Sequence, residues 1–138
     1  MDTMNDYTAD ADNETLRILD RMNVFMLERD LSVVEEFAPD ADVLLVASEA
    51  NELAIGSAEI KAFFGRLMSH PVTYSWDWRQ KKVSSAGDIA WIFADGDIVM
   101  HGAEGEVRTP YRMTAVLERY SEKWLIRQFH GSEPAHRP

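Results

Sequence analysis

The feature that most constrains the fold of this chain is a change of hydrophobic period at Pro71. Before Pro71, apolar residues recur every three or four positions, as Ile60 and Phe64 do, which is the spacing of one helix face. After Pro71 they alternate with polar residues, as Tyr74 and Trp76 do, which is the spacing of one strand face. The chain therefore divides into a helical first part and a sheet-forming second part.

The first part predicts three helices and one strand. Asn13 is a good N-cap for a long amphipathic helix, and Ser32-x-x-Glu35 is typical of a capping box for a second, short helix. Gly56-Ser57 opens the third helix, and the apolar run before it predicts a buried strand. The expected helices cover 13–29, 33–37 and 57–70, and the strand covers 41–47.

The second part predicts four long strands joined by short turns. They are expected over 72–86, 89–101, 108–120 and 123–132. Short connections favour an antiparallel meander over parallel units that need a crossover helix. The resulting fold class is α+β, with three N-terminal helices packed on a curved, mainly antiparallel sheet.

The length of the chain limits the number of domains, and its net charge limits the kinds of partner. A chain of 138 residues corresponds to one domain, expected here over 13–133, with a disordered acidic arm over 1–12 and a tail over 134–138. The net charge of −10 opposes nucleic acid and anionic membrane surfaces as partners. No cysteine is present, which excludes disulfides and thiolate chemistry, and no apolar run could span a membrane. We expect a cytoplasmic domain.

Several short motifs follow one another in an informative order. They are Asp30-Leu31, Phe37-Ala38-Pro39-Asp40-Ala41-Asp42-Val43, Gly56-Ser57-Ala58-Glu59-Ile60, Gly87-Asp88-Ile89-Ala90-Trp91, Arg112-Met113-Thr114-Ala115-Val116, Lys123-Trp124-Leu125-Ile126 and His130-Gly131-Ser132. With the element order, they resemble the SnoaL-like branch of the nuclear transport factor 2-like superfamily, over about residues 13–133. That superfamily also includes the association domain of calcium/calmodulin-dependent kinase II.

The resemblance implies a cystatin-like, cone-shaped α+β barrel with a pocket, and usually a homodimer formed through the outer sheet face. Members isomerise, dehydrate or cyclise small molecules, or only bind or assemble, so the fold does not give the function. The ketosteroid isomerase base would fall at about Leu45, its tyrosine at about Met22 and its protonated acid at about Thr114. None of these residues keeps the required chemistry.

Strand alternation places candidate site residues on common faces. Arg112 and Thr114 share one face, Gln128 and His130 another, and Trp91 and Asp95 a third. If these faces are concave, the six residues line a ligand pocket with aromatic walls and few polar groups. A bulge in a strand would invert the assignment.

Two of these residues have alternative interpretations. A buried Arg112 would bind a carboxylate or phosphate of a ligand, or else form a structural ion pair with Asp95, Asp97 or Glu49. His130 could act as a general base oriented by Asp95, or could bond neighbouring backbone at a strand end. No histidine pair has metal-ligand spacing, so neither a metal nor another cofactor is expected.

Three functions are compatible with these patterns. The first is a homodimeric module that binds a small organic, possibly anionic, ligand in the cone. The second is an isomerase, lyase or cyclase in which His130 or Asp95 transfers a proton. The third is an oligomerisation or association domain.

Overall fold

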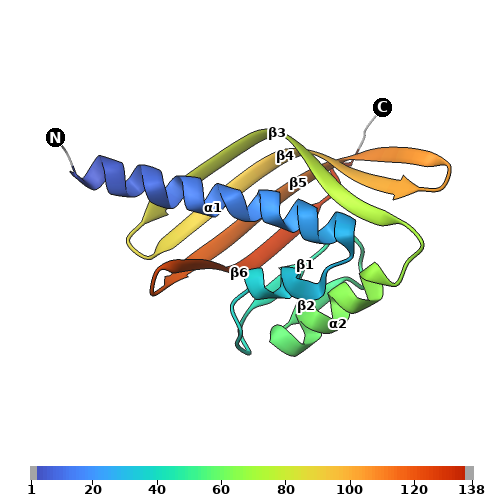
Figure 1. Cartoon of the computed structure of the whole chain (residues 1–138), viewed down its shortest axis with the longest axis horizontal. Helices are drawn as coiled ribbons and strands as arrows, with labels where there is room; N and C mark the ends of the chain where they lie inside the picture. The colour runs from blue at the N-terminus through green and yellow to red at the C-terminus, as the bar shows by residue number, and fades with distance from the viewer. Residues whose placement is uncertain (1–2, 136–138) are drawn as a thin grey trace.

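A long helix lies along one face of a curved six-stranded sheet (Figure 1). The structure, a computed structural model, describes residues 3–135, with side chains from Asp12 onward. The helix, α1 (Thr3–Glu28), begins ten residues before the expected Asn13, so the acidic segment continues the helix instead of forming an arm. Acidic residues favour a helix N-terminus because they face the positive end of the helix dipole. Residues 1–2 of the expected arm and 136–138 of the expected tail lie outside the described residues.

A short 3₁₀ helix, η1 (Leu31–Glu36), follows α1. Its N-cap is Asp30, whose side chain accepts the Ser32 N–H at 2.9 Å, so the capping box expected at Ser32 is not formed. Buried Glu36 ties η1 to α1, because both of its carboxylate oxygens accept the Arg21 Nε–H at 2.9 Å.

Two short strands and a helix complete the first part of the chain. They are β1 (Leu44–Val46), β2 (Leu53–Ile55) and α2 (Ser57–Met68). The α2 helix begins where Gly56-Ser57 predicts it, and β1 lies inside the longer strand expected over 41–47. The sequence analysis missed β2, since three residues are too short to show a period.

The four long strands form the meander that alternation predicts. They are β3 (Thr73–Ala86), β4 (Ile89–Gly102), β5 (Gly105–Tyr120) and β6 (Lys123–Ser132). All pair antiparallel with their chain neighbours, whereas β1 pairs parallel with β6. The sheet order is β2-β1-β6-β5-β4-β3, so the sheet is open, with edges at β2 and β3, and does not close into a barrel.

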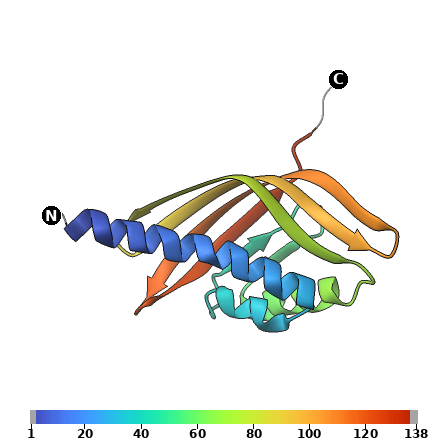
Figure 2. The ribbon, with the colours of Figure 1, turned by 45° about the horizontal axis from the view of Figure 1, so that its top comes forward.

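The concave face of the sheet encloses the core. Figure 2 shows the sheet arching over α1, with β1, β2 and α2 beneath the sheet near the C-terminal end of α1. Ile18 and Met22 of α1, Ile60 of α2, and Met113 and Leu117 of β5 are each at most 1% exposed. The α+β fold on a curved, mainly antiparallel sheet is therefore confirmed.

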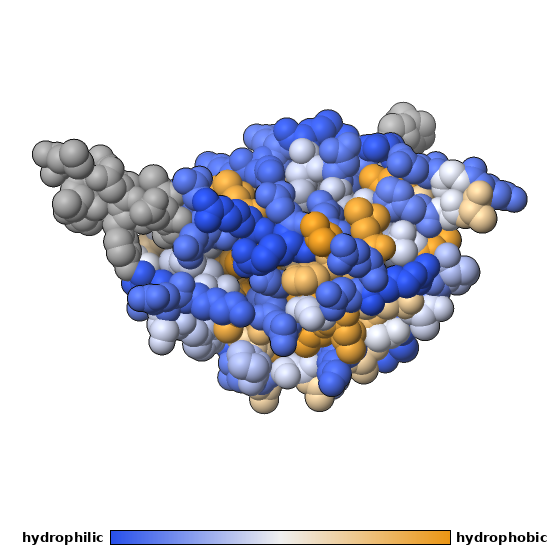
Figure 3. All heavy atoms as spheres, viewed as in Figure 1, coloured by the Kyte–Doolittle hydropathy of each residue, from blue (hydrophilic) through white to orange (hydrophobic). Residues whose placement is uncertain are grey.

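The helix-bearing face shows hydrophobic residues between hydrophilic ones (Figure 3). On α1, Val24 and Leu27 are 51% and 47% exposed. None of the helices described is both long enough and apolar enough to cross a membrane.

Candidate functional site

The six residues expected to line a pocket lie together, but on the outer face of the sheet. Pairing places Asp95 opposite Arg112, and Thr114 opposite His130. Arg112, Thr114, Gln128 and His130 are exposed, as is Trp91 at 48%. The expectation that these side chains occupy the concave face is corrected.

A bulge accounts for part of this inversion. The register between β5 and β6 shifts so that Val116 pairs with Gln128 and Leu117 with Ile126, which leaves Arg127 unmatched. Ile126 and Phe129 are consequently both buried, although they are three residues apart. Strict alternation would place Ile126 on one face with Gln128 and His130, and it fails at the bulge.

The outer position also decides between the alternatives for Arg112. Its Nε donates to Asp95 Oδ1 at 3.1 Å, and the Arg112 side chain is 59% exposed. The structural ion pair is therefore present, and it lies away from the concave face. His130 is exposed as well, so it cannot act as a base inside a cavity.

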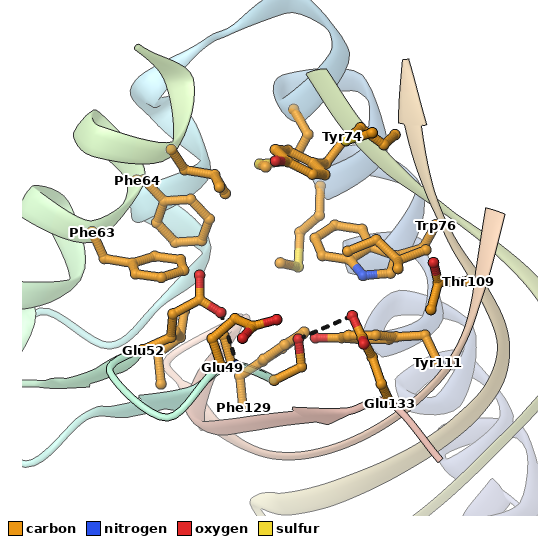
Figure 4. A pocket seen from close by; sticks show the side chains of 18 of the residues that line it. Glu49, Glu52, Phe63, Phe64, Tyr74, Trp76, Thr109, Tyr111, Phe129 and Glu133 are labelled. Carbon is orange, nitrogen blue, oxygen red and sulfur yellow. Dashed lines mark hydrogen bonds between the residues drawn. The ribbon is translucent and has the colours of Figure 1, made fainter. Parts of the chain in front are cut away.

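A cavity of about 360 Å³ opens instead on the concave face of the sheet, near the C-terminal end of α1. It lies among the C-terminal part of α1, the helix α2, the loop between β1 and β2, and the inner sides of β3–β6. Six aromatic side chains form much of its wall (Figure 4): Phe63, Phe64, Tyr74, Trp76, Tyr111 and Phe129.

Ring contacts tie the sheet-side aromatics together. The Trp76 and Trp78 rings stack with centroids 6.2 Å apart and planes 7° apart, and Trp76 also meets Phe129 at 6.1 Å. Trp78 in turn contacts Tyr111 at 6.1 Å. Trp76 and Trp78 lie two residues apart in β3, so they share one strand face, and that face packs inward.

An asparagine of α1 fixes the backbone that carries Trp76. The Asn23 amide donates to Trp76 O at 2.9 Å and accepts the Trp76 N–H at 2.8 Å. β3 is an edge strand, so its outward backbone groups have no neighbouring strand. Asn23 satisfies both groups as a neighbouring strand would, and it holds Trp76 at the cavity wall.

Tyr111 brings a hydroxyl to the cavity through space left by a glycine. A Cβ added to Gly131 would lie 1.6 Å from the Tyr111 hydroxyl oxygen, so only glycine fits there. Burial, and then the nearby carboxylates of Glu52 and Glu133, raise the pKa of Tyr111 above its ordinary value. The Trp76 indole lies near this hydroxyl and acts in the opposite direction, lowering the pKa of Tyr111. The geometry between the two groups does not meet that of a hydrogen bond.

The opening of the cavity carries three carboxylates. Glu49 and Glu52 come from the loop between β1 and β2, and Glu133 follows β6. Glu52 accepts the Glu49 N–H at 3.0 Å, and Glu133 accepts the Ser48 hydroxyl at 3.4 Å. Among the described residues, none of the three glutamates forms a salt bridge with a cationic side chain.

Apart from Tyr111 and the three carboxylates, the polar side chains that line the cavity are Ser48, His70, Tyr74 and Thr109. Met22 and Leu45, where the resemblance placed two isomerase residues, do line it, but both are apolar. Thr114, the third position, is on the outer face. Within residues 3–135, no group of three or more acidic or histidine side chains is arranged to hold a metal ion.

Sequence reasoning missed the residues of this cavity, although one signal was available. Tyr111, Met113 and Ala115 alternate with Arg112 and Thr114, and the first set is the more apolar. Choosing the more apolar set as the inner face would have placed Tyr111 inside. The loop glutamates and Glu133 follow no period, so only the three-dimensional structure shows that they converge.

Comparison with known proteins extends over nearly the whole chain. A family described as "SnoaL-like domain" matches residues 16–136. No curated protein matches the sequence. The solved structures named below are 18–20% identical, so they match at the level of the fold.

Three of these structures illustrate the range. An NTF2-like protein of unknown function from Pseudomonas putida is 18% identical, with TM-score 0.79, covering 94% of this chain and 90% of its own. A candidate dehydratase of the NTF2-like family from Streptomyces avermitilis is 18% identical, with TM-score 0.81 and coverages of 92% and 99%. A candidate calcium/calmodulin-dependent protein kinase II association domain from Xanthomonas campestris is 20% identical, with TM-score 0.75 and coverages of 90% and 88%.

Proposed function

The chain belongs to the SnoaL-like domain family, and we propose that it binds a small, largely apolar organic molecule in the cavity beside Trp76 and Tyr111. The observation that carries this proposal is a cavity of about 360 Å³ with six aromatic side chains in its wall. Cavities of this size that combine apolar walls with a few polar groups are the usual form of small-molecule sites.

The charged groups at the opening of the cavity narrow the class of ligand that it could bind. Arg112, which suggested an anion, is paired with Asp95 on the outer face and does not reach the cavity. The opening carries Glu49, Glu52 and Glu133 instead. These carboxylates would repel an anionic ligand, so the proposed ligand is not an anion.

The alternatives explain less of the structure. Proton transfer by His130 or Asp95 is not proposed, because both residues lie on the outer face. A domain that only associates with partners would leave the cavity, and the Asn23 contacts that shape it, without a role. A cytoplasmic location remains part of the proposal and is open to test by cell fractionation.

We also propose that two copies associate through the outer sheet face, as the family resemblance implies. Trp91 is 48% exposed there, in a shallow depression that it shares with Phe93, Thr114 and Val116. An aromatic side chain of this exposure among other apolar groups is typical of an interface. The dimer face and the cavity lie on opposite sides of the sheet.

Binding is tested by NMR through the indole N–H signal of Trp76, assigned with Trp76→Phe. We expect the probe neopentylbenzene to shift this signal in the native protein. Thr109→Trp, which places a large ring in the cavity, should abolish the shift. Arg112→Ala, on the outer side of the same strand, should leave it intact. If no apolar probe shifts the signal, or if Thr109→Trp binds as the native chain does, the proposed function is wrong.

A further inference from the structure

The opening of the cavity concentrates negative charge, and no cationic side chain within the described residues forms a salt bridge with its carboxylates. Glu49 and Glu52 lie on one side, and Glu133 lies beside Tyr111 on the other (Figure 4). Several arginines elsewhere in the chain pair with carboxylates, as Arg108 does with Asp77 and Arg127 with Asp40. Like charges held around one opening repel one another, and a bound cation would relieve that repulsion.

A second observation indicates that the space is made for a ligand. Tyr111 is only 3% exposed and forms part of the cavity wall. Beside it, the Trp76 indole nitrogen is buried without a partner in the described part of the chain. Buried polar groups are almost always paired, so the unpaired Trp76 N–H points to a ligand at this wall, where an aromatic ring of the ligand's apolar body can accept it.

The walls suit an organic cation better than a metal ion. The aromatic faces of Trp76, Tyr111 and Phe129 attract positive charge through their quadrupoles and also offer apolar contact. The acidic side chains described are not arranged as a metal-binding group. The site therefore combines carboxylates at its opening with aromatic rings inside.

We propose that the cavity binds an organic cation, in which an apolar body lies among the aromatic side chains and an amine or quaternary ammonium group lies near Glu49, Glu52 and Glu133. This inference rests on the proposed function, since it specifies the ligand class of the same cavity. It also predicts that the cavity prefers a cation to an anion of similar shape, which a purely apolar pocket would not do.

The test compares three probes of similar shape in the native protein. Benzyltrimethylammonium is the cation, neopentylbenzene is its neutral isostere, and phenylacetate is the anion. Titrations follow the Trp76 indole N–H signal at low salt. We expect the cation to bind and phenylacetate not to bind. Raising the ionic strength from about 20 to 500 mM should weaken binding of the cation and leave the neutral probe unchanged.

The variant that tests the carboxylates is Glu52→Gln combined with Glu133→Gln. We expect it to lower the ratio of cation affinity to neutral-probe affinity about tenfold, because two of the three carboxylates that attract the cation lose their charge. Glu122→Gln is the control, since it also removes a carboxylate but lies in the turn at the opposite end of β6. It should leave the ratio unchanged.

The outcomes separate the two proposals. If neopentylbenzene shifts the Trp76 signal but the cation does not, or if the affinity ratio is unaffected by both the variant and salt, the cation inference is overturned and the cavity remains a binding site. If the double variant does not fold, the salt dependence in the native protein decides in the same way. If neither probe binds, the proposed function itself fails.

Discussion

At the scale of single residues, the cavity depends on the absence of a side chain at position 131. Gly131→Ala would place a Cβ 1.6 Å from the Tyr111 hydroxyl and 2.3 Å from its ring carbon Cζ, so the ring must move. We expect a loss of about 1–3 kcal/mol in the free energy of unfolding, measured by urea denaturation, as for other overpacked cores. Gly65→Ala, which meets no atom within 4 Å, should be neutral or stabilising. An unchanged Gly131→Ala variant would contradict this account of Tyr111.

The Tyr111 hydroxyl also predicts a pH dependence. Burial raises its pKa in the folded chain, whereas the unfolded chain ionises tyrosine near its ordinary pKa of 10.0. The unfolded state therefore gains stability as the pH rises above about 10, and the free energy of unfolding falls. Tyr111→Phe should remove part of this fall between about pH 9 and pH 11 in urea denaturation. Equal slopes in native and Tyr111→Phe proteins would refute the prediction.

At the scale of elements, the contact between α1 and β3 shapes the site. Asn23→Ala would leave the Trp76 N–H and C=O without their partner, and we expect a loss of about 1–3 kcal/mol in stability. Asn23→Asp should also destabilise, because a carboxylate accepts the N–H but cannot donate to the carbonyl. Hydrogen exchange at the Trp76 amide should become faster in both variants.

Asn13→Ala provides the matched control on the same helix. The Asn13 side chain is exposed, so its removal should change stability by no more than about 0.5 kcal/mol. If Asn23→Ala were as mild as Asn13→Ala, the amide contact would not be what holds β3 to α1.

The elements themselves were largely predictable, for reasons that the structure makes clear. The β6 strand spans the 123–132 that alternation predicts, and β4 begins at Ile89 as expected, because each has a buried face next to a clear turn. The start of α1 was wrong, since its acidic first turns carry no apolar period to read. In the structure, Asp12 accepts the Ser85 hydroxyl at 3.3 Å, a contact with β3 that no local pattern reveals.

At the scale of the whole molecule, the difficulty lay in choosing between the two faces of the sheet. Alternation correctly grouped Arg112 with Thr114, but it does not say which group faces inward. The outer face contains Trp91 and Phe93, so aromatic content alone does not mark the interior. Because Arg127 has no partner in β5, the inward and outward alternation of β6 after this residue is out of phase with the alternation before it. The cavity residues come from α1, α2, the loop between β1 and β2, and all four long strands, so they could not be grouped before the fold was known.

The two faces also predict that association and binding can be separated. We expect the native protein to show about twice its chain mass of 15.7 kDa by light scattering, and Trp91→Glu to show the monomer mass, because a charge at the centre of the outer apolar depression opposes pairing. Val24→Glu, on α1 at similar exposure, is the control and should remain dimeric. A monomeric native protein at micromolar concentration, or a dimeric Trp91→Glu variant, would overturn the proposed interface.

The same variant tests whether the faces act independently. The cavity lies on the concave side, and Trp91 does not line it. Monomeric Trp91→Glu protein should therefore still bind benzyltrimethylammonium, with an affinity close to that of the native chain, as followed through the Trp76 indole signal. Loss of binding in a folded monomer would mean that the second copy shapes the cavity. Retained binding would locate recognition within a single chain and leave association to the opposite face of the same sheet.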